Sequence, residues 1–232
     1  MKSIQKTKTF DTLLLAHTLK HALTAIKWSL KMIFKGDFGK INEKQKNILE
    51  KTIEKNESLI SLVNNLLDTA KIKEGNYSYN KSLTSIEDII ESTIECFKEE
   101  AKEKGIKIEF KKPEEKTPKI MIDKEMVKLA IQNMFDNAVK YSLPNSEINI
   151  FLKSGKKDVE IQIQDSGIGI PEKQKDKLFN KFFRADNAIK IDADGSGIGL
   201  FLAKNIIEAH NGKIWFESEE NKGTTFYFSL PI

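Results

Sequence analysis

Residues 133–141 read NMFDNAVKY, residues 165–171 read DSGIGIP, residues 194–200 read DGSGIGL and residues 222–226 read KGTTF. The first stretch lies in a helical pattern, the second follows an alternating strand pattern, the third opens a helix and the fourth enters a strand. Glycines let a backbone approach a ligand closely, and free amides at a helix N-terminus favour phosphate. A single glycine stretch is more often an ordinary turn, so only the combination indicates a ligand site.

Three polar side chains share one face of the first predicted helix, because Asn133, Asn137 and Lys140 are spaced at i, i+4 and i+7. Such a face can simply be solvated. It can also form a site for metal and phosphate, since amide oxygens ligate Mg²⁺, which takes its other oxygens from water and a nucleotide. Asp165, when ionised, can accept a hydrogen bond from an amino group such as that of adenine.

Two common nucleotide-binding motifs are absent from the sequence. There is no GxxxxGK[ST] loop, and the glycine stretches lack the strand, loop and helix context of a Rossmann fold. Helices and strands are instead predicted in mixed order, which favours an α/β sandwich with helices on one face of a largely antiparallel sheet. The expected helices are residues 85–104, 123–142 and 197–210, and the expected strands are residues 106–110, 119–122, 147–153, 158–164, 213–218 and 224–230.

The N-terminal third has a different pattern, that of two long helices at residues 3–34 and 43–73. Two glycines within residues 35–40 allow the chain to reverse, and Asn42 can cap the second helix. Each helix carries an apolar stripe wider than one partner can cover. The stripes can pack on the rest of the same chain, but a second copy is the simpler solution and gives a dimeric antiparallel four-helix bundle.

A polar stretch at residues 74–81 separates the two patterns and indicates a linker that leads into a strand. We therefore expect an α+β protein of two domains. The first is a helical hairpin over residues 1–76, and the second is the α/β sandwich over residues 77–232.

The composition is that of an ordinary soluble protein, with 39% hydrophobic and 31% charged residues. A net charge of +4 over 232 residues does not indicate a nucleic-acid partner. We expect no membrane span and no signal peptide, and the lone Cys96 excludes an intrachain disulfide framework and fits the cytoplasm. Of the 38 basic residues all but Arg184 are lysine, and a planar guanidinium suits phosphate.

In this order the four stretches resemble the N, G1, G2 and G3 boxes of the ATP-binding domain of sensor histidine kinases, a branch of the superfamily that includes DNA gyrase. LFNKFFR at residues 178–184 resembles the F box of that domain, and the resemblance covers about residues 79–232. It implies ATP and Mg²⁺ as ligands. Asn137 would hold the metal, and Arg184 would reach the terminal phosphate, where a guanidinium suits the charge of phosphoryl transfer.

The resemblance implies further contacts in the same domain. Lys140 and Tyr141 would contact phosphate and nucleotide, Asp165 would recognise adenine, and residues 185–196 would form a mobile lid. The other nucleotide-binding positions implied are Asn133, Gly167, Gly169, Gly195, Gly197, Gly199, Leu200 and Thr225.

The hairpin resembles the dimerisation and phosphotransfer domain of the same family, best at LTAIKW (residues 23–28) and LLDTAKI (residues 66–72). The family's phosphorylated histidine lies seven residues before the position of Thr24, which makes it His17, and a neutral imidazole offers a nitrogen lone pair. The resemblance implies a homodimeric protein-histidine kinase of a two-component system. It would phosphorylate His17 with ATP and pass the group to an aspartate in the receiver domain of a response regulator.

Three residues near His17 depart from the family pattern. Thr18 stands where the family has an acidic residue, and a hydroxyl cannot accept the histidine proton at neutral pH, which puts the kinase activity in question. His21 replaces a threonine or asparagine associated with dephosphorylation. Ala22 replaces the proline that bends the helix, so we expect a straighter helix.

Three interpretations of the altered helix stay open. The chain is a working kinase with a variant acceptor helix, or an ATP-binding dimer that transfers phosphate poorly, or a dimer whose helix has been rebuilt for another purpose. In the last case His17 and His21, at i and i+4, can share a metal, and the facing copies of a two-fold bundle could supply four ligands. A gyrase-like ATPase is a further rival, which the predicted bundle weakens.

Overall fold

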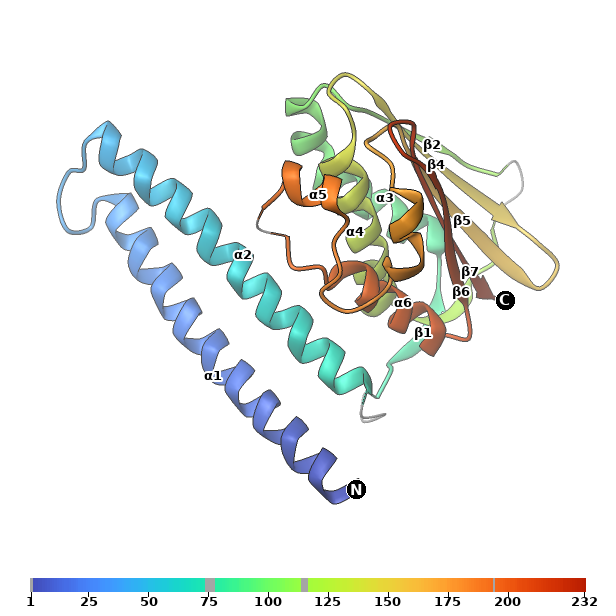
Figure 1. Cartoon of the computed structure of the whole chain (residues 1–232), viewed down its shortest axis with the longest axis horizontal. Helices are drawn as coiled ribbons and strands as arrows, with labels where there is room; N and C mark the ends of the chain where they lie inside the picture. The colour runs from blue at the N-terminus through green and yellow to red at the C-terminus, as the bar shows by residue number, and fades with distance from the viewer. Residues whose placement is uncertain (1, 74–77, 114–116, 194) are drawn as a thin grey trace. The chain divides into compact units, whose positions relative to one another are not determined.

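The computed structural model (Figure 1) describes four stretches, residues 2–73, 78–113, 117–193 and 195–232. The chain divides into two compact units, Met1–Tyr77 and Ser78–Ile232. The domain boundary expected after residue 76 falls within residues 74–77, outside the described residues.

The first unit is a hairpin of two helices, α1 (Lys2–Lys35) and α2 (Glu43–Lys73), as the periodicity predicts (Figure 1). The helix α1 continues through Ala22, where no proline removes a backbone donor. The chain reverses at Gly36 and Gly39, whose φ angles of +85° and +120° suit glycine alone.

Polar groups fix the start of α2 and its alignment with α1. The backbone amide of Gln45 donates to Asn42 Oδ1 at 3.0 Å, and the amide of Asn42 donates to Gln45 Oε1 at 2.9 Å, which is a reciprocal cap. Between the helices, the buried Asn56 donates its Nδ2 to the Leu23 carbonyl oxygen at 2.9 Å. This bond sets the register of the two helices.

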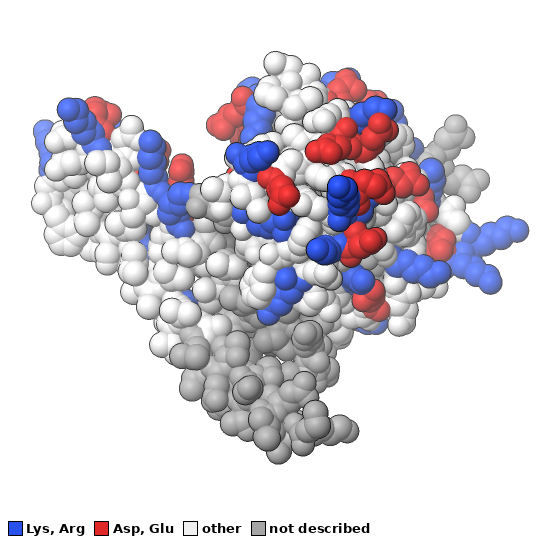
Figure 2. Space-filling view, viewed as in Figure 1, with Lys and Arg blue, Asp and Glu red and all other residues white. Residues whose placement is uncertain are grey.

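Little apolar surface of the hairpin is buried within one chain. Among its described side chains, the buried hydrophobic ones are Ala16, Val63 and Leu67, with Leu23 packed against them. Much of the described surface of this unit is uncharged in Figure 2. Large hydrophobic side chains are exposed along both helices and at the turn: Leu19, Ile26, Trp28, Met32, Ile33, Phe38, Ile48 and Leu59.

The second unit is built on a five-stranded sheet in the order β2-β4-β5-β7-β6. The strand β2 runs parallel to β4, and the other neighbours are antiparallel. The strands are β2 (Lys107–Lys111), β4 (Glu147–Ser154), β5 (Asp158–Asp165), β6 (Lys213–Glu219) and β7 (Gly223–Pro231). Two further strands, β1 (Lys81–Thr84) and β3 (Ile120–Asp123), form a separate antiparallel pair.

Three longer helices cover one face of the sheet, as the sequence predicts (Figure 1). They are α3 (Ile86–Glu103), α4 (Lys124–Tyr141) and α6 (Gly199–Ala209). Ser85 caps α3 and Asp123 caps α4, each by accepting a bond from a backbone amide three residues on. Alternate strand residues face the helices and are buried, among them Ile148, Ile150, Ile161, Ile163 and Phe228. The predicted α/β sandwich is thereby confirmed.

The segment between β5 and α6 holds more structure than the sequence predicts. It contains a 3₁₀ helix, η1 (Glu172–Lys177), and a short helix, α5 (Asp186–Ile191), which lies inside the expected lid. The helix α6 begins at Gly199 rather than at Gly197, because Gly197 has a φ of +65°, which a right-handed helix does not accommodate. No helix in the described part of the chain is long and apolar enough to cross a membrane.

Candidate functional site

One face of α4 carries the amide groups that the sequence brings together. Asn133 and Asn137 are half-buried, and their Nδ2 atoms donate to backbone oxygens one turn earlier, Leu129 O at 2.8 Å and Asn133 O at 2.7 Å. Both side-chain oxygens are therefore left as acceptors. A Cβ on Gly199 would lie 2.6 Å from Asn133 Oδ1, so the glycine lets the start of α6 approach this amide.

Asp165 ends β5 as a buried carboxyl group, 6% exposed. Its Oδ1 accepts hydrogen bonds from the backbone amides of Gly167 at 3.0 Å and Thr224 at 3.1 Å. Burial raises the pKa of Asp165 from 3.8 to about 7, although both amide donors lower it. Neither of these bonds uses Oδ2, which can serve as the contact to a ligand.

Three segments far apart in the sequence meet around Asp165. Ser142, just after α4, forms an isolated antiparallel bridge with Gly167. A Cβ on Gly167 would lie 2.3 Å from the Tyr141 carbonyl oxygen, and a Cβ on Gly223 would lie 2.2 Å from the Asp165 carbonyl oxygen. Glycine is needed at both positions because the backbones touch there.

Lys140 and Arg184 converge on one carboxylate, that of Asp192. Lys140 Nζ lies 3.2 Å and Arg184 Nη2 lies 3.8 Å from Asp192 Oδ2, and Lys140 Nζ is also 3.7 Å from Asp136 Oδ2. Burial lowers the pKa of Lys140, but the charges of Asp136 and Asp192 outweigh it and the net shift is upward. A Cβ on Gly195 would come within 2.9 Å of both Arg184 Cζ and Asp192 Oδ2.

Asp192 is a residue of this site that no sequence motif singles out. The only signal was its position as an acidic residue in the expected lid. Its neighbour Asp194 lies outside the described residues.

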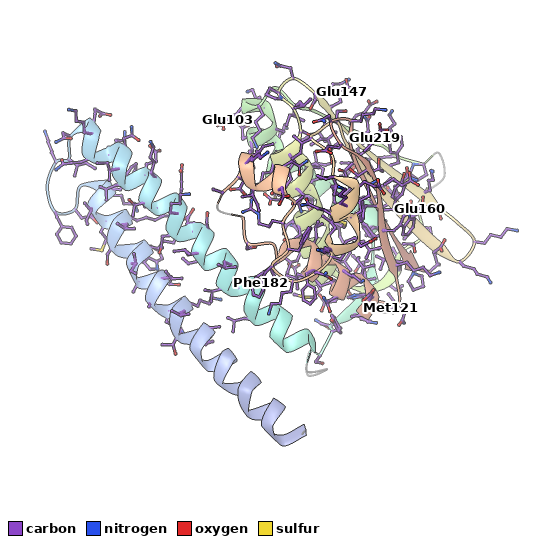
Figure 3. All side chains as sticks on the ribbon, viewed as in Figure 1. Glu103, Met121, Glu147, Glu160, Phe182 and Glu219 are labelled. Carbon is purple, nitrogen blue, oxygen red and sulfur yellow. The ribbon has the colours of Figure 1, made fainter. Side chains whose placement is uncertain are left out.

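The F-box-like segment is joined to the start of α6. The backbone amide of Phe182 donates to the Gly197 carbonyl oxygen at 2.9 Å, and a Cβ on Gly197 would lie 2.7 Å from Phe182 C. Phe182 has a φ of +66°, which is unusual for an aromatic residue, and its side chain is 59% exposed (Figure 3). This turn thus joins the segment that carries Arg184 to the residues just before α6.

The other predicted positions lie at the edges of this site. Gly169, with a φ of +60°, packs its backbone on that of Glu219, where a Cβ would meet the carbonyl oxygen at 2.0 Å. Leu200 is half-buried in the first turn of α6. Thr225 pairs with Gln164 in the β5–β7 ladder, one residue beyond the Asp165 contacts.

An open pocket of about 270 Å³ adjoins Lys140 and the end of α4. Two of the predicted nucleotide contacts, Lys140 and Tyr141, line it. The remaining wall is mostly apolar, and is made by Lys104, Ser142, Leu143, Pro144, Ile168 and Ile191. An apolar wall beside cations suits a ligand with a flat base and phosphates.

In the hairpin, His17 and His21 lie one turn apart on the surface of α1. Both are exposed, and their ring centroids are 4.6 Å apart in an edge-to-face contact. Among the described residues, no three His, Cys, Asp or Glu side chains come together as a metal site. Within one chain the two imidazoles therefore have no third ligand from such side chains among the described residues. A metal site completed by a second copy stays a prediction.

Acidic and basic side chains are mixed on the face of the second unit seen in Figure 2 rather than gathered by sign. A basic surface of the kind that binds nucleic acid is therefore not seen on that face.

Two family models match the chain. Residues 14–75 match the "His Kinase A (phospho-acceptor) domain", and residues 122–232 match the "Histidine kinase-, DNA gyrase B-, and HSP90-like ATPase". Sensor histidine kinase WalK of Bacillus subtilis (strain 168) is 31% identical over 93% of this chain and 35% of its own length. Sensor protein kinase WalK of Staphylococcus aureus is 32% identical over 93% of this chain and 52% of its own length. The chain therefore spans about a third to a half of these relatives.

Solved structures are similar as well. Full-length ShkA, solved in complex with AMPPNP, has a TM-score of 0.77 and 22% identity over 95% of this chain and 45% of its own. The catalytic domain of histidine kinase ThkA has a TM-score of 0.58 and 29% identity over 66% of this chain and 95% of its own. The likeness to ShkA concerns the fold, and the likeness to ThkA concerns about two thirds of this chain.

Proposed function

This chain belongs to the sensor histidine kinase family, and on that premise we propose that it binds ATP with Mg²⁺ in its second unit and phosphorylates His17. The observation that carries the proposal is the convergence of Lys140 and Arg184, from different segments, on one anion position, with Asn133 and Asn137 on the same face of α4 as Lys140. Two cations and two amide oxygens together are a donor set that suits a metal-chelated polyphosphate.

The nucleotide would lie between the two ends of this site. Asp165, held by the two backbone amides on its Oδ1, would accept the adenine amino group on its other oxygen. Asn137 would provide a carbonyl oxygen for Mg²⁺, with Asn133 beside it. Bound Mg²⁺ would neutralise phosphate charge, and Arg184 would carry the charge that develops on the terminal group in the transition state.

His17 would be the nucleophile of the transfer. A lone pair of its imidazole would form the new bond to the terminal phosphorus while the bond from phosphorus to the bridging oxygen breaks and ADP departs. The proton on the other ring nitrogen must then be lost. Because the hydroxyl of Thr18 is no base at neutral pH, this proton would go to water, and we propose a transfer slower than with an acidic neighbour.

The exposed apolar stripe of the hairpin supports a second copy as partner. Leu19, Ile26 and Leu59 are each about half exposed, at 54%, 48% and 48%. A symmetric pairing of two hairpins would bury these side chains. We propose a homodimer with a four-helix bundle, from which phosphorylated His17 passes its phosphoryl group to an aspartate of a response-regulator receiver domain.

Labelling with γ-³²P ATP and Mg²⁺ tests the proposal. We expect acid-labile, base-stable label on the wild type, none on His17→Ala, and ATP affinity by calorimetry that is the same in both. His21→Ala is the matched control and should retain label. A second candidate function is an ATP-binding dimer that does not transfer phosphate, and the only observation in its favour is Thr18. Nucleotide binding without label on any of the three proteins would indicate this candidate. Label that survives His17→Ala would contradict the assignment of the acceptor.

A further inference from the structure

Asp192 ties together the two cations that the proposed function assigns to phosphate. Its Oδ2 is 3.2 Å from Lys140 Nζ and 3.8 Å from Arg184 Nη2. The side chains of Asp192 and Arg184 are only 17% and 12% exposed, so water competes weakly for these contacts. Through these two contacts Asp192 links α4, which carries Lys140, to the F-box-like segment, residues 178–184, which carries Arg184.

The backbone around Asp192 is held by the same guanidinium. Arg184 Nη1 donates to the Ala193 carbonyl oxygen at 3.1 Å, and Nη2 donates to the Ala188 carbonyl oxygen at 3.4 Å and to that of Asp192. The Arg184 side chain thus holds the C-terminal end of α5 and the two residues that follow it. These three hydrogen bonds of Arg184 all go to backbone oxygens of residues 188–193.

The neighbouring acidic residues Asp186 and Asp136 do not contact both Lys140 and Arg184 as Asp192 does. Asp186, at the start of α5, accepts a bond from Gln174 Nε2 at 2.6 Å. Asp136 is 3.7 Å from Lys140 Nζ, but it lies four residues before Lys140 on the same helix. Among the ion pairs of the described residues, only those of Asp192 include both Lys140 and Arg184.

We propose that Asp192 is an internal competitor of the nucleotide phosphates, a positioning residue that holds Lys140, Arg184 and the 188–193 segment together until phosphate displaces its carboxylate. The inference rests on the proposed function for the identity of the ligand. The physical reason is that the two cations cannot pair fully with a carboxylate and a phosphate at one position, and the two anions would repel each other there. Nucleotide binding and release of this segment are therefore coupled.

Calorimetry on the full chain separates this role from a merely structural one. Asp192→Asn keeps the shape and removes the charge, and we expect it to bind ADP about fivefold more tightly, as expected for loss of one ion-pair competitor. Adenosine, which has no phosphate, should bind both proteins equally. Asp176→Asn, a matched change at an exposed residue of η1, should leave both affinities as in the wild type. Unchanged or weaker ADP binding by Asp192→Asn overturns the proposal, as does weakening seen only with Mg²⁺, which would make Asp192 a metal ligand.

Trypsin digestion tests the same contact without any nucleotide. Lys190 is an exposed residue of α5, inside the segment that Arg184 and Asp192 close. We expect cleavage after Lys190 to be faster in Asp192→Asn than in the wild type and in Asp176→Asn, because the segment opens more often. Equal cleavage rates overturn the proposal.

The two assays together separate this proposal from the proposed function. If the wild type binds no ADP while Asp192→Asn is cleaved faster, the proposed function fails and the contact of Asp192 with Arg184 stands. If the wild type binds ADP and Asp192→Asn matches it in both assays, the competitor role alone fails.

Discussion

The two units of this chain differ in how far they bury their own apolar surface. In the second unit, helices cover one face of a sheet, and residues such as Ile161 and Phe228 are fully buried within one chain. In the hairpin, Leu19 and Leu59 are about half exposed. A unit that completes its own core can fold by itself, whereas two long helices with one uncovered stripe depend on a partner.

The same two units also differ in how closely they follow the family pattern. The proposed nucleotide site has all of the expected boxes, and Asp165 and Arg184 are among its predicted residues. In the acceptor helix, the sequence resemblance predicts other residues at the positions of Thr18 and His21. The four predictions below test this contrast, in order of decreasing expected effect.

The largest effect concerns the cores. Phe228→Ala should lower the free energy of unfolding of the second unit by about 3–5 kcal/mol, because it leaves a cavity in a closed core. Leu59→Ala should leave that transition unchanged and make the hairpin transition more dependent on protein concentration, because it weakens pairing between chains. Scanning calorimetry at two concentrations measures both, and a hairpin transition that is independent of concentration would contradict the dependence on a partner.

Arg184→Lys should slow phosphoryl transfer about 100-fold, because an ammonium cannot spread its donors over the oxygens of the transition state. ATP affinity should change by less than about threefold, since Lys140 and the amides of α4 remain. Single-turnover labelling and calorimetry measure the two quantities. Equal losses of affinity and rate would assign Arg184 to ground-state binding instead.

Thr18→Glu should raise the rate of labelling of His17 about tenfold, because a carboxylate next to the imidazole can take up its proton. ATP affinity should not change, since the substitution lies outside the second unit. Ser29→Glu, an exposed change on the same helix, is the control for added charge. If the two variants label at the same rate, the replacement at position 18 does not limit transfer.

The smallest effect is a pH dependence that comes from Asp165. With a pKa of about 7, the fraction of this carboxyl that is ionised increases steeply between pH 6 and pH 8. If adenine needs the ionised form, ATP affinity should rise by at most about tenfold across that interval, with release of a proton on binding. Calorimetry in buffers of different ionisation enthalpy measures the proton.

Asp136→Asn is the matched control for this measurement, because burial also raises the pKa of Asp136. The control should keep the pH dependence of ATP affinity and Asp165→Asn should lose it, while a flat profile in the wild type would remove Asp165 from adenine recognition.

The raised pKa of Asp165 also affects the stability of the fold. The protonated form of Asp165 stabilises the fold, so its contribution is complete below pH 3.8 and is lost as the pH rises through about 7.

The helices, their caps and most of the strands could be predicted because they depend on near neighbours in the chain. Asn42 and Ser85 cap helices through residues three positions away. The strands follow the alternation of apolar and polar residues, and the boxes are contiguous motifs. The face shared by Asn133, Asn137 and Lys140 follows from helical spacing alone.

Other features depend on residues that only the fold brings together. One of the two amides that hold Asp165 belongs to Thr224, 59 residues away. Burial raises the pKa of Asp165 and this bond lowers it, and both effects come from the tertiary structure. No pattern within residues 107–111 or 147–154 predicts that β2 pairs in parallel with β4. Asp192 looks like any acidic loop residue until α4 and the F-box segment place Lys140 and Arg184 beside it. Charge and burial act through space, so their effect at a site depends on the tertiary structure rather than on order along the chain.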